Sequence, residues 1–365
     1  MSQSLLTERI TLPKFFYFEN SYLLAKRADR RDRIGRRRSA VLRRRDVEAP
    51  QFFSFTFPFR ALILVVVDRP TLTLPSFAKI NLHLQVVGRR VDGFHDLCTV
   101  FQTISLHDTL SVSPASAIGM TCGNETLPVG DENLVMRAAH ALQRRYNVSC
   151  GARLHLEKLI PAPGGLGGGS SNAAVALLAL KKLWNLDIFF EDLHPIAADL
   201  GSDVPFFLYG GTALGMGRGE IVEPIDDFTE NSVLVVTPNV AVATRDAFRR
   251  LKARALTKQE SKRKLQICRF DLESADFKYT SFKNDFETTV FAAYPEVERV
   301  KNTLLDLGAG RAMLSGSGGS VFAIFDKDET RQAALKALDI EVNWRKFAVA
   351  TISRNEYREA LKEVL

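Results

Sequence analysis

The stretch that decides the fold reads Pro161-Ala162-Pro163-Gly164-Gly165-Leu166-Gly167-Gly168-Gly169-Ser170-Ser171, and an apolar run from Ala173 to Leu180 follows it. The glycines allow the backbone to adopt positive φ angles and to approach a ligand closely. Ser170, Ser171 and Asn172 are residue types that cap the N-terminus of a helix. The stretch therefore predicts a glycine loop followed by a helix that starts near residue 173.

A glycine loop that leads into a helix is typical of an anion site, because unpaired N–H groups and the helix dipole both favour negative charge. A nucleotide polyphosphate is the natural anion. The loop is not a common P-loop, since no lysine follows the glycines, and it lacks the strand and ribose-binding acid of a dinucleotide fingerprint. A flexible linker is the alternative, although a linker would not usually run straight into a capped apolar helix. Positive charge for the phosphates must come from elsewhere in the chain.

The segment from Lys79 to Val86 alternates between polar and apolar residues. Ile80, Leu82 and Leu84 fall on one side, and Lys79 and Asn81 fall on the other. This alternation predicts a half-buried strand. Because side chains two positions apart point the same way in a strand, Lys79 and Asn81 are expected to project together.

The remaining pattern mixes strands and helices without a regular alternation, which predicts an α+β fold. The predicted strands are 100–112, 153–159, 206–211, 233–237 and 321–325. The predicted helices are 131–146, 190–200 and 244–251, and the polar segment 252–264 is interpreted as an exposed loop. A shift in composition near residue 221 divides the pattern into two predicted domains, 71–220 and 221–365.

The first 70 residues differ from the rest of the chain in charge. They contain 15 Lys and Arg against 7 Asp and Glu, whereas the rest contains 34 against 35. Such a basic segment could bind nucleic acid or an acidic membrane surface, could be an organelle-targeting arm, or could be a solvated tail with no partner. We expect residues 1–70 to be a disordered extension.

The four cysteines, at positions 98, 122, 150 and 268, form neither a C-x-x-C motif nor a metal-binding spacing. We interpret them as reduced thiols of a cytoplasmic protein. No apolar run reaches the length of a membrane span, so we expect no membrane association. The oligomeric state is left open.

Five motifs in this order resemble those of the GHMP kinase superfamily, over residues 71 to 355. The motifs are Pro75-Ser76-Phe77-Ala78-Lys79-Ile80-Asn81-Leu82, Arg90-Val91-Asp92-Gly93-Phe94-His95, Gly165 to Ser171, Gly201-Ser202-Asp203-Val204-Pro205-Phe206-Phe207, and Ser315-Gly316-Ser317-Gly318. The Asp-Gly-aromatic-His element resembles the superfamily members that phosphorylate a cytidyl alcohol of the non-mevalonate isoprenoid pathway. Two departures are Pro163, where glycine or alanine is usual, and Phe94, where many members have tyrosine.

The resemblance implies a two-domain α+β fold whose first domain binds ATP, and a small cytidyl alcohol as the substrate. It implies that Asp203 is the base, that Lys79 is the catalytic cation, and that Asn81 orients substrate or phosphate. Pro161 to Ser171 would be the ATP phosphate loop, and Phe94, His95 and Phe248 would form the cytosine pocket. Mg²⁺ is implied by ATP chemistry, with no ligand assigned. The alternatives are a kinase of the mevalonate or homoserine type and, less expected, a nucleic-acid-binding protein that acts through the basic arm.

Removal of residues 1–70 is expected to leave a folded and fully active kinase, because the motifs begin only after residue 71. The check is ADP release by the 71–365 fragment beside the full chain, and a loss of activity would contradict the expectation. The segment could also be an upstream extension that results from a misassigned translation start. The natural protein would then start at a non-methionine codon, with Val65 to Val67 as the candidates. Recovery of peptides from residues 9–60 by mass spectrometry of the natural protein would exclude that start. Three acids within and beside the basic run, Asp29, Asp32 and Asp46, count against a transit arm.

Overall fold

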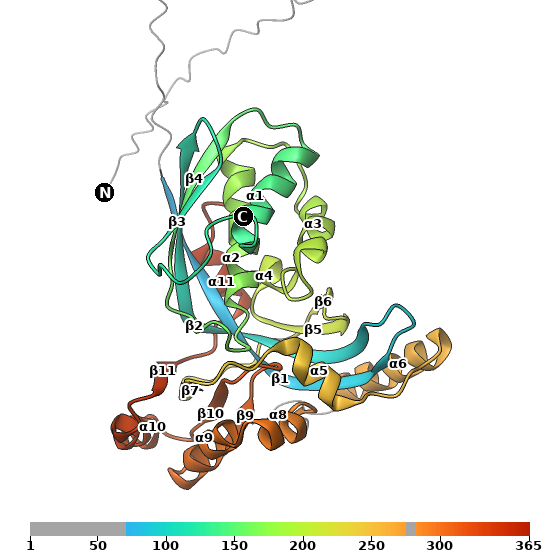
Figure 1. Ribbon diagram of the computed structural model, residues 1–365, viewed down its shortest axis with the longest axis vertical. Coiled ribbons are helices and arrows are strands. Elements are labelled where there is room, and N and C mark those ends of the chain that lie inside the picture. The colour runs from blue at the N-terminus through green and yellow to red at the C-terminus, as the bar shows by residue number, and fades with distance from the viewer. Residues whose placement is uncertain (1–70, 275–281) are drawn as a thin grey trace, which may run out of the picture. The chain divides into compact units, whose positions relative to one another are not determined.

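The computed structural model describes residues 71–274 and 282–365, and the expectation for residues 1–70 lies outside this range. Two β-sheets form the framework (Figure 1). The larger sheet contains seven strands: β1 (Leu72–Arg89), β2 (His95–Ala115), β3 (Gly119–Cys122), β4 (Gly151–Glu157), β5 (Thr212–Gly217), β6 (Ile221–Pro224) and β8 (Lys283–Asn284). The smaller sheet contains four: β7 (Val233–Pro238), β9 (Arg311–Leu314), β10 (Val321–Ile324) and β11 (Trp344–Val349).

The long strands β1 and β2 are the centre of the larger sheet. They pair antiparallel over nearly their whole length, with register shifts beside Phe77 and at Asn81–His83. β2 also pairs with β5 through its first half and with β4 through its second half. β8 joins the other side of β1 in parallel. β1 is therefore an interior strand at His83 and Leu84, whereas Lys79 and Asn81 pair with β2 alone, and Lys79 N donates to Leu166 O of the glycine loop at 2.9 Å.

Helices cover one side of the upper part of this sheet (Figure 1). They are α1 (Leu134–Arg145), α2 (Gly168–Leu183), α3 (Leu193–Leu200), which follows the short η1 (Phe190–Asp192), α4 (Phe206–Tyr209) and α11 (Arg354–Ala360). α2 lies in the middle of this layer and packs against α1, α3, α4 and the two long strands. It is apolar all round and buried along most of its length, as expected for a helix enclosed by protein.

The C-terminal part builds the antiparallel sheet β11-β7-β10-β9, with its helices beneath it in Figure 1. These helices are α8 (Glu287–Ala293), α9 (Pro295–Asp306) and α10 (Asp328–Ala337), which η2 (Leu338–Ile340) extends. Two further helices, α5 (Thr244–Leu251) and α6 (Lys258–Ser274), lie beside the β1–β2 hairpin. The α+β prediction is confirmed. The proposed division at residue 220 falls between β5 and β6, which pair with each other, and remains a proposal.

Four local predictions need correction. The helix after the glycine loop starts at Gly168, with Gly167 rather than a serine at the N-cap, so the last glycines belong to its first turn. β1 is buried on both faces, because loops cover the polar face that was expected to meet solvent. The predicted strand 206–211 is the helix α4, whose aromatic residues pack against α2; packing overrides their β-propensity. Part of the predicted loop 252–264 is α6, which buries Cys268 and Leu272 and partly buries Leu265 at helical spacing.

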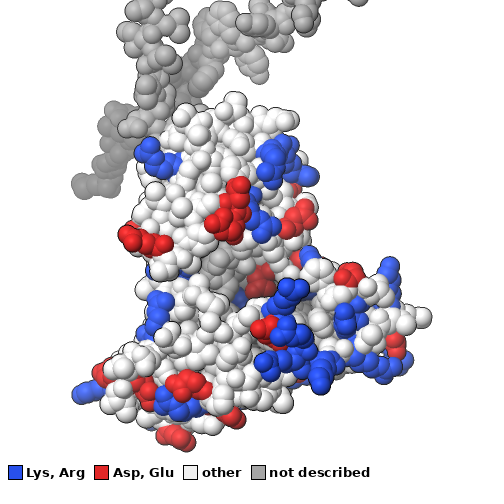
Figure 2. Space-filling view, viewed as in Figure 1, with Lys and Arg blue, Asp and Glu red and all other residues white. Residues whose placement is uncertain are grey.

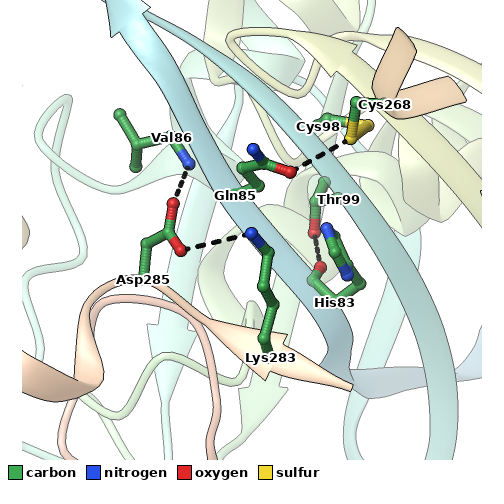
Figure 3. The surroundings of a disulfide bond; sticks show 8 residues. All are labelled: His83, Gln85, Val86, Cys98, Thr99, Cys268, Lys283 and Asp285. Carbon is green, nitrogen blue, oxygen red and sulfur yellow. Dashed lines mark hydrogen bonds and ion pairs between the residues drawn. A yellow bond between two sulfur atoms is a disulfide. The ribbon is translucent and has the colours of Figure 1, made fainter. Parts of the chain in front are cut away.

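Cys98 on β2 and Cys268 on α6 form a disulfide between positions 170 residues apart (Figure 3). The expectation of four reduced thiols is therefore wrong for this pair, whereas Cys122 and Cys150 are free. The bond ties α6 to the strand that carries His95 and Thr99. Within the described ranges, no helix has the length and apolar character that crossing a bilayer requires.

Candidate functional site

A cleft of about 1550 Å³ brings together the segments that the sequence analysis singled out. The cleft is lined by six predicted site residues, Lys79, Asn81, Phe94, His95, Asp203 and Phe248, and by residues 161–170 of the glycine loop. Gly316 also lines it and belongs to the motif Ser315 to Gly318, which we call the second glycine turn. The hollow lies in the middle of the face drawn in Figure 2, and basic side chains gather beside it over α5. Of the predicted site residues, only Ser171 is not part of the lining; it is fully buried in the first turn of α2.

Lys79 is held at the bottom of the cleft by three oxygens. Its ammonium donates hydrogen bonds to Asn81 Oδ1 at 2.7 Å and to Gly165 O at 3.0 Å. It also forms an ion pair with Asp203 Oδ2 at 3.5 Å. The lysine is 3% exposed, whereas the Asp203 side chain is 35% exposed. A buried cation therefore faces a carboxylate that remains open to a substrate.

Asn81 is fixed by a chain of hydrogen bonds across the hairpin. Its amide donates to Thr99 Oγ1 at 2.8 Å, and that hydroxyl donates to His83 O at 2.6 Å. The amide oxygen consequently faces Lys79, which orients the ammonium. Thr99 is a residue that sequence reasoning missed, because nothing in the sequence distinguishes it from the other threonines of the same strand, Thr103 and Thr109.

The glycine loop and the second glycine turn are hydrogen-bonded to each other next to Lys79. Gly165 and Gly316 both have positive φ angles, of +79° and +62°. Ser315 Oγ donates to Gly165 O at 3.1 Å, and Ser320 N donates to Gly164 O at 3.1 Å. A side chain on Gly316 would begin only 3.3 Å from Lys79 Nζ, so glycine is needed there.

The amino end of α2 opens into the cleft. The first N–H groups of a helix have no partner within the helix, and they carry the positive end of its dipole. Gly167, Gly168, Gly169 and Ser170 line the cleft at this end, and the first turn contains no acidic residue. This end of the helix is therefore suited to bind phosphate oxygens.

The entry to the glycine loop is held by Asp108, which sequence reasoning also missed. Asp108 Oδ1 accepts hydrogen bonds from Leu159 N at 2.7 Å and Ile160 N at 2.8 Å, and Asp108 Oδ2 pairs with Lys158 Nζ at 3.0 Å. Burial lowers the pKa of Lys158, and the Asp108 carboxylate opposes this shift. The loop thus starts from a backbone that is fixed by a buried carboxylate.

Aromatic rings and a guanidinium form the other end of the cleft. The rings of His95 and Phe248 lie 4.9 Å apart at a shallow angle of 32°. The Phe94 ring, 52% exposed, also lines the cleft and is covered by the Arg218 guanidinium at 4.8 Å. Burial and the nearby Arg89 lower the pKa of His95, which favours the neutral form of its ring. A neutral imidazole can both donate and accept a hydrogen bond.

Arg218 is the third residue that sequence reasoning missed. It lies in the turn between β5 and β6, and its side chain also contacts Glu220 at 3.7 Å. A side chain on its neighbour Gly219 would begin 3.7 Å from Asp203 Oδ1. The turn that carries Arg218 and Gly219 is thus close both to Phe94 and to Asp203. Arginine in a turn is common, so the sequence alone gave no reason to select it.

Two protein-family models match this chain. The GHMP kinases N terminal domain matches residues 133–211, which contain the glycine loop and Asp203, and the GHMP kinases C terminal model matches residues 272–343, which contain the second glycine turn.

Individual proteins and a solved structure are similar over a longer range. The chain is 42% identical over 264 residues to the 4-diphosphocytidyl-2-C-methyl-D-erythritol kinase of Chlorobium limicola and 40% identical over 268 residues to that of Chlorobium phaeobacteroides. These matches cover 72% and 73% of this chain and 91% of each relative. A crystal structure of 4-(cytidine 5'-diphospho)-2C-methyl-D-erythritol kinase has a TM-score of 0.61 at 32% identity, over 77% of this chain and 99% of that one.

Proposed function

The chain belongs to the 4-diphosphocytidyl-2-C-methyl-D-erythritol kinase family of GHMP kinases, and from this premise we propose that it transfers the γ-phosphoryl group of ATP to the 2-hydroxyl of that cytidyl alcohol. The reaction gives ADP and the 2-phosphate, and it belongs to the non-mevalonate route to isoprenoid precursors. The observation that carries the proposal is the Lys79–Asp203 pair, 3.5 Å apart, beside the glycine loop.

In the proposed mechanism, Asp203 accepts the proton of the 2-hydroxyl as its oxygen attacks the γ-phosphorus. The bond between that phosphorus and the β–γ bridging oxygen breaks, and ADP leaves. Lys79 supplies positive charge beside the transferring group, where the glycine loop has no lysine of its own. Phosphoryl transfer needs positioning and charge stabilisation more than covalent chemistry, and this pair provides both.

The glycine loop, from Pro161 to Ser171, would hold the phosphates of ATP through its N–H groups and the amino end of α2. The Ser170 hydroxyl and the Asp203 carboxylate, which both line the cleft, are oxygen donors of the kind that Mg²⁺ prefers. When bound, Mg²⁺ would neutralise phosphate charge. Within the described ranges, His, Cys, Asp and Glu residues form no metal-binding cluster of three or more.

The aromatic end of the cleft would bind the cytosine, between Phe94 and the His95–Phe248 pair. A flat ring can stack there while His95 exchanges hydrogen bonds with its polar edge. Arg218, which lines the cleft and covers Phe94, is suited to the diphosphate that links cytidine to the reacting alcohol, because guanidinium groups bind phosphate strongly. The cleft thus offers a place for each part of the substrate in order.

Replacing His95 by alanine is expected to raise the KM for the cytidyl alcohol by roughly 10-fold or more, because a hydrogen bond and a stacking surface are both lost. The KM for ATP should change little. Steady-state kinetics with each substrate varied in turn will check this split. His155→Ala, at a histidine outside the cleft lining, is the matched control. An equal rise in both KM values would remove His95 from the cytosine pocket.

The proposal as a whole is tested by ADP release from the purified protein with three alcohols: the cytidyl alcohol, mevalonate and homoserine. Turnover with the cytidyl alcohol alone supports it. Turnover with mevalonate or homoserine instead would assign a different GHMP kinase activity. A protein without turnover whose affinity for nucleic acid falls steeply with salt would favour the nucleic-acid-binding alternative. The cytoplasmic location remains part of the proposal.

A further inference from the structure

A four-residue segment, Asn284 to Glu287, is attached to β1, the strand that carries Lys79. Asn284 pairs with Leu84 of β1 in β8, and Asp285 N donates to Leu84 O at 3.0 Å. In return, Val86 N donates to Asp285 Oδ2 at 2.8 Å (Figure 3). Because bonds run in both directions, the 284–287 segment and β1 are fixed to each other.

Asn284 also holds the second glycine turn from behind. Its amide nitrogen donates to Leu314 O at 2.8 Å and to Gly316 O at 2.7 Å, and its amide oxygen accepts from Phe286 N at 2.9 Å. The residue is 6% exposed, so these three bonds replace solvent contacts. The amide therefore fixes the carbonyl of Gly316, a residue at which a Cβ would come within 3.3 Å of Lys79 Nζ and 3.4 Å of Asn81 Oδ1.

Glu287 provides a second attachment to Leu314, the last residue of β9 before the turn. Its Oε1 accepts from Leu314 N at 3.0 Å, and its Oε2 pairs with Lys301 at 2.7 Å. The backbone of Leu314 is thus hydrogen-bonded at its carbonyl by Asn284 and at its N–H by Glu287. Both attachments end next to the turn that contacts the glycine loop.

Phe286 contacts the other end of the cleft. It is 1% exposed as a whole, and part of it lines the cleft. Its ring meets that of Phe248 edge to face at 4.7 Å, and Phe248 stacks against His95 at 4.9 Å. Phe286 therefore sets the position of the ring that closes the aromatic pocket.

We propose that the 284–287 segment positions both ends of the cleft, with Asn284 acting on the phosphoryl-transfer end through Gly316 and Phe286 acting on the cytidyl end through Phe248. This inference rests on the proposed function. Asn284 lies behind the turn and acts through it, so it is a positioning residue. Since both residues belong to one short segment fixed to β1, the two ends of the cleft share one support.

The test separates the two ends by kinetics. Asn284→Asp removes both amide donors at constant size, and Asn284→Ser keeps one hydroxyl donor. We expect the aspartate variant to lower kcat by roughly 10- to 100-fold and to raise the KM for ATP, because small displacements of reacting groups have effects of this size. The serine variant should be intermediate. The KM for the cytidyl alcohol should stay within about 2-fold.

Phe286→Leu should have the opposite effect on the two substrates from the Asn284 variants. The KM for the cytidyl alcohol should rise roughly 3- to 10-fold, and the KM for ATP should not change. Phe325→Leu is the matched control, since Phe325 is equally buried in the same hydrophobic core but does not line the cleft. It should lower the melting temperature without a selective change in either KM.

Two results would overturn the inference. If the Asn284 and Phe286 variants changed all kinetic constants in parallel with Phe325→Leu, the segment would serve stability alone. If neither Asn284 variant folded, the amide would be needed for folding, and this result would contradict the proposed positioning role. Failure of the proposed function itself is distinguishable, because the unmodified protein would then show no turnover with the cytidyl alcohol.

Discussion

Replacement of Asp203 by asparagine is expected to lower kcat by roughly 10²- to 10⁴-fold, the usual contribution of a general base. Asparagine has nearly the same shape but cannot accept the proton of the attacking hydroxyl. Asp203 has the exposure that this role requires, because its side chain is 35% exposed within the cleft while Lys79 beneath it is buried. Single-turnover kinetics with saturating substrates will measure the chemical step directly.

ATP binding should survive the Asp203→Asn change, since the phosphate loop contributes its N–H groups independently. Calorimetric titration with ATP checks this. Asp199→Asn, at an exposed carboxylate on α3 outside the cleft lining, is the matched control and should behave like the unmodified protein. Near-normal turnover by a folded Asp203→Asn protein would exclude the base role.

Replacement of Lys79 by alanine is expected to lower kcat by roughly 10²- to 10³-fold, with a smaller effect on ATP affinity. The charge is needed most when negative charge builds up on the transferring phosphoryl group. Removal of the ammonium also leaves Asn81 Oδ1 without its donor and leaves Gly165 O with the Ser315 hydroxyl alone, and an unpaired buried acceptor is costly.

Lys79→Met separates charge from packing, because methionine keeps most of the aliphatic stem. The methionine variant should show the same loss of kcat as the alanine variant, but its melting temperature should be higher than that of the alanine variant. Lys346→Met, at a lysine that binds the carbonyls of Leu338 and Glu341 outside the cleft lining, is the control. A Lys79 variant that lost only ATP affinity would make Lys79 a binding residue instead.

The sequence predicts those parts of the site that are local in the chain. The glycine loop with its helix, and the Lys79–Asn81 spacing on one strand, follow from backbone conformation and strand periodicity, and the structure brings both into one cleft. The same periodicity predicts a solvated polar face for β1, because alternation reports which residues share a face and not what covers it. Here the glycine segments cover that face, so Lys79 and Asn81 are buried.

The parts that could not be predicted depend on contacts between distant segments. Asp108 holds Ile160 across 52 positions, and Cys98 reaches Cys268 across 170, with no local pattern at either end. Asn284 resembles any polar residue next to a turn until the carbonyls of Leu314 and Gly316 are placed around it. The aromatic run at 206–209 favours a strand by propensity and becomes a helix through its packing.

The central claim is that the cleft transfers a phosphoryl group from ATP to the 2-hydroxyl of the cytidyl alcohol. Phosphorus NMR of the reaction mixture tests it most directly, because it reports both the donor and the site of attachment. We predict one new phosphomonoester on the 2-oxygen, formed in equal amount with ADP, while the diphosphate of the cytidyl alcohol remains intact. Release of inorganic phosphate alone, or a phosphoester on another hydroxyl, would contradict the account.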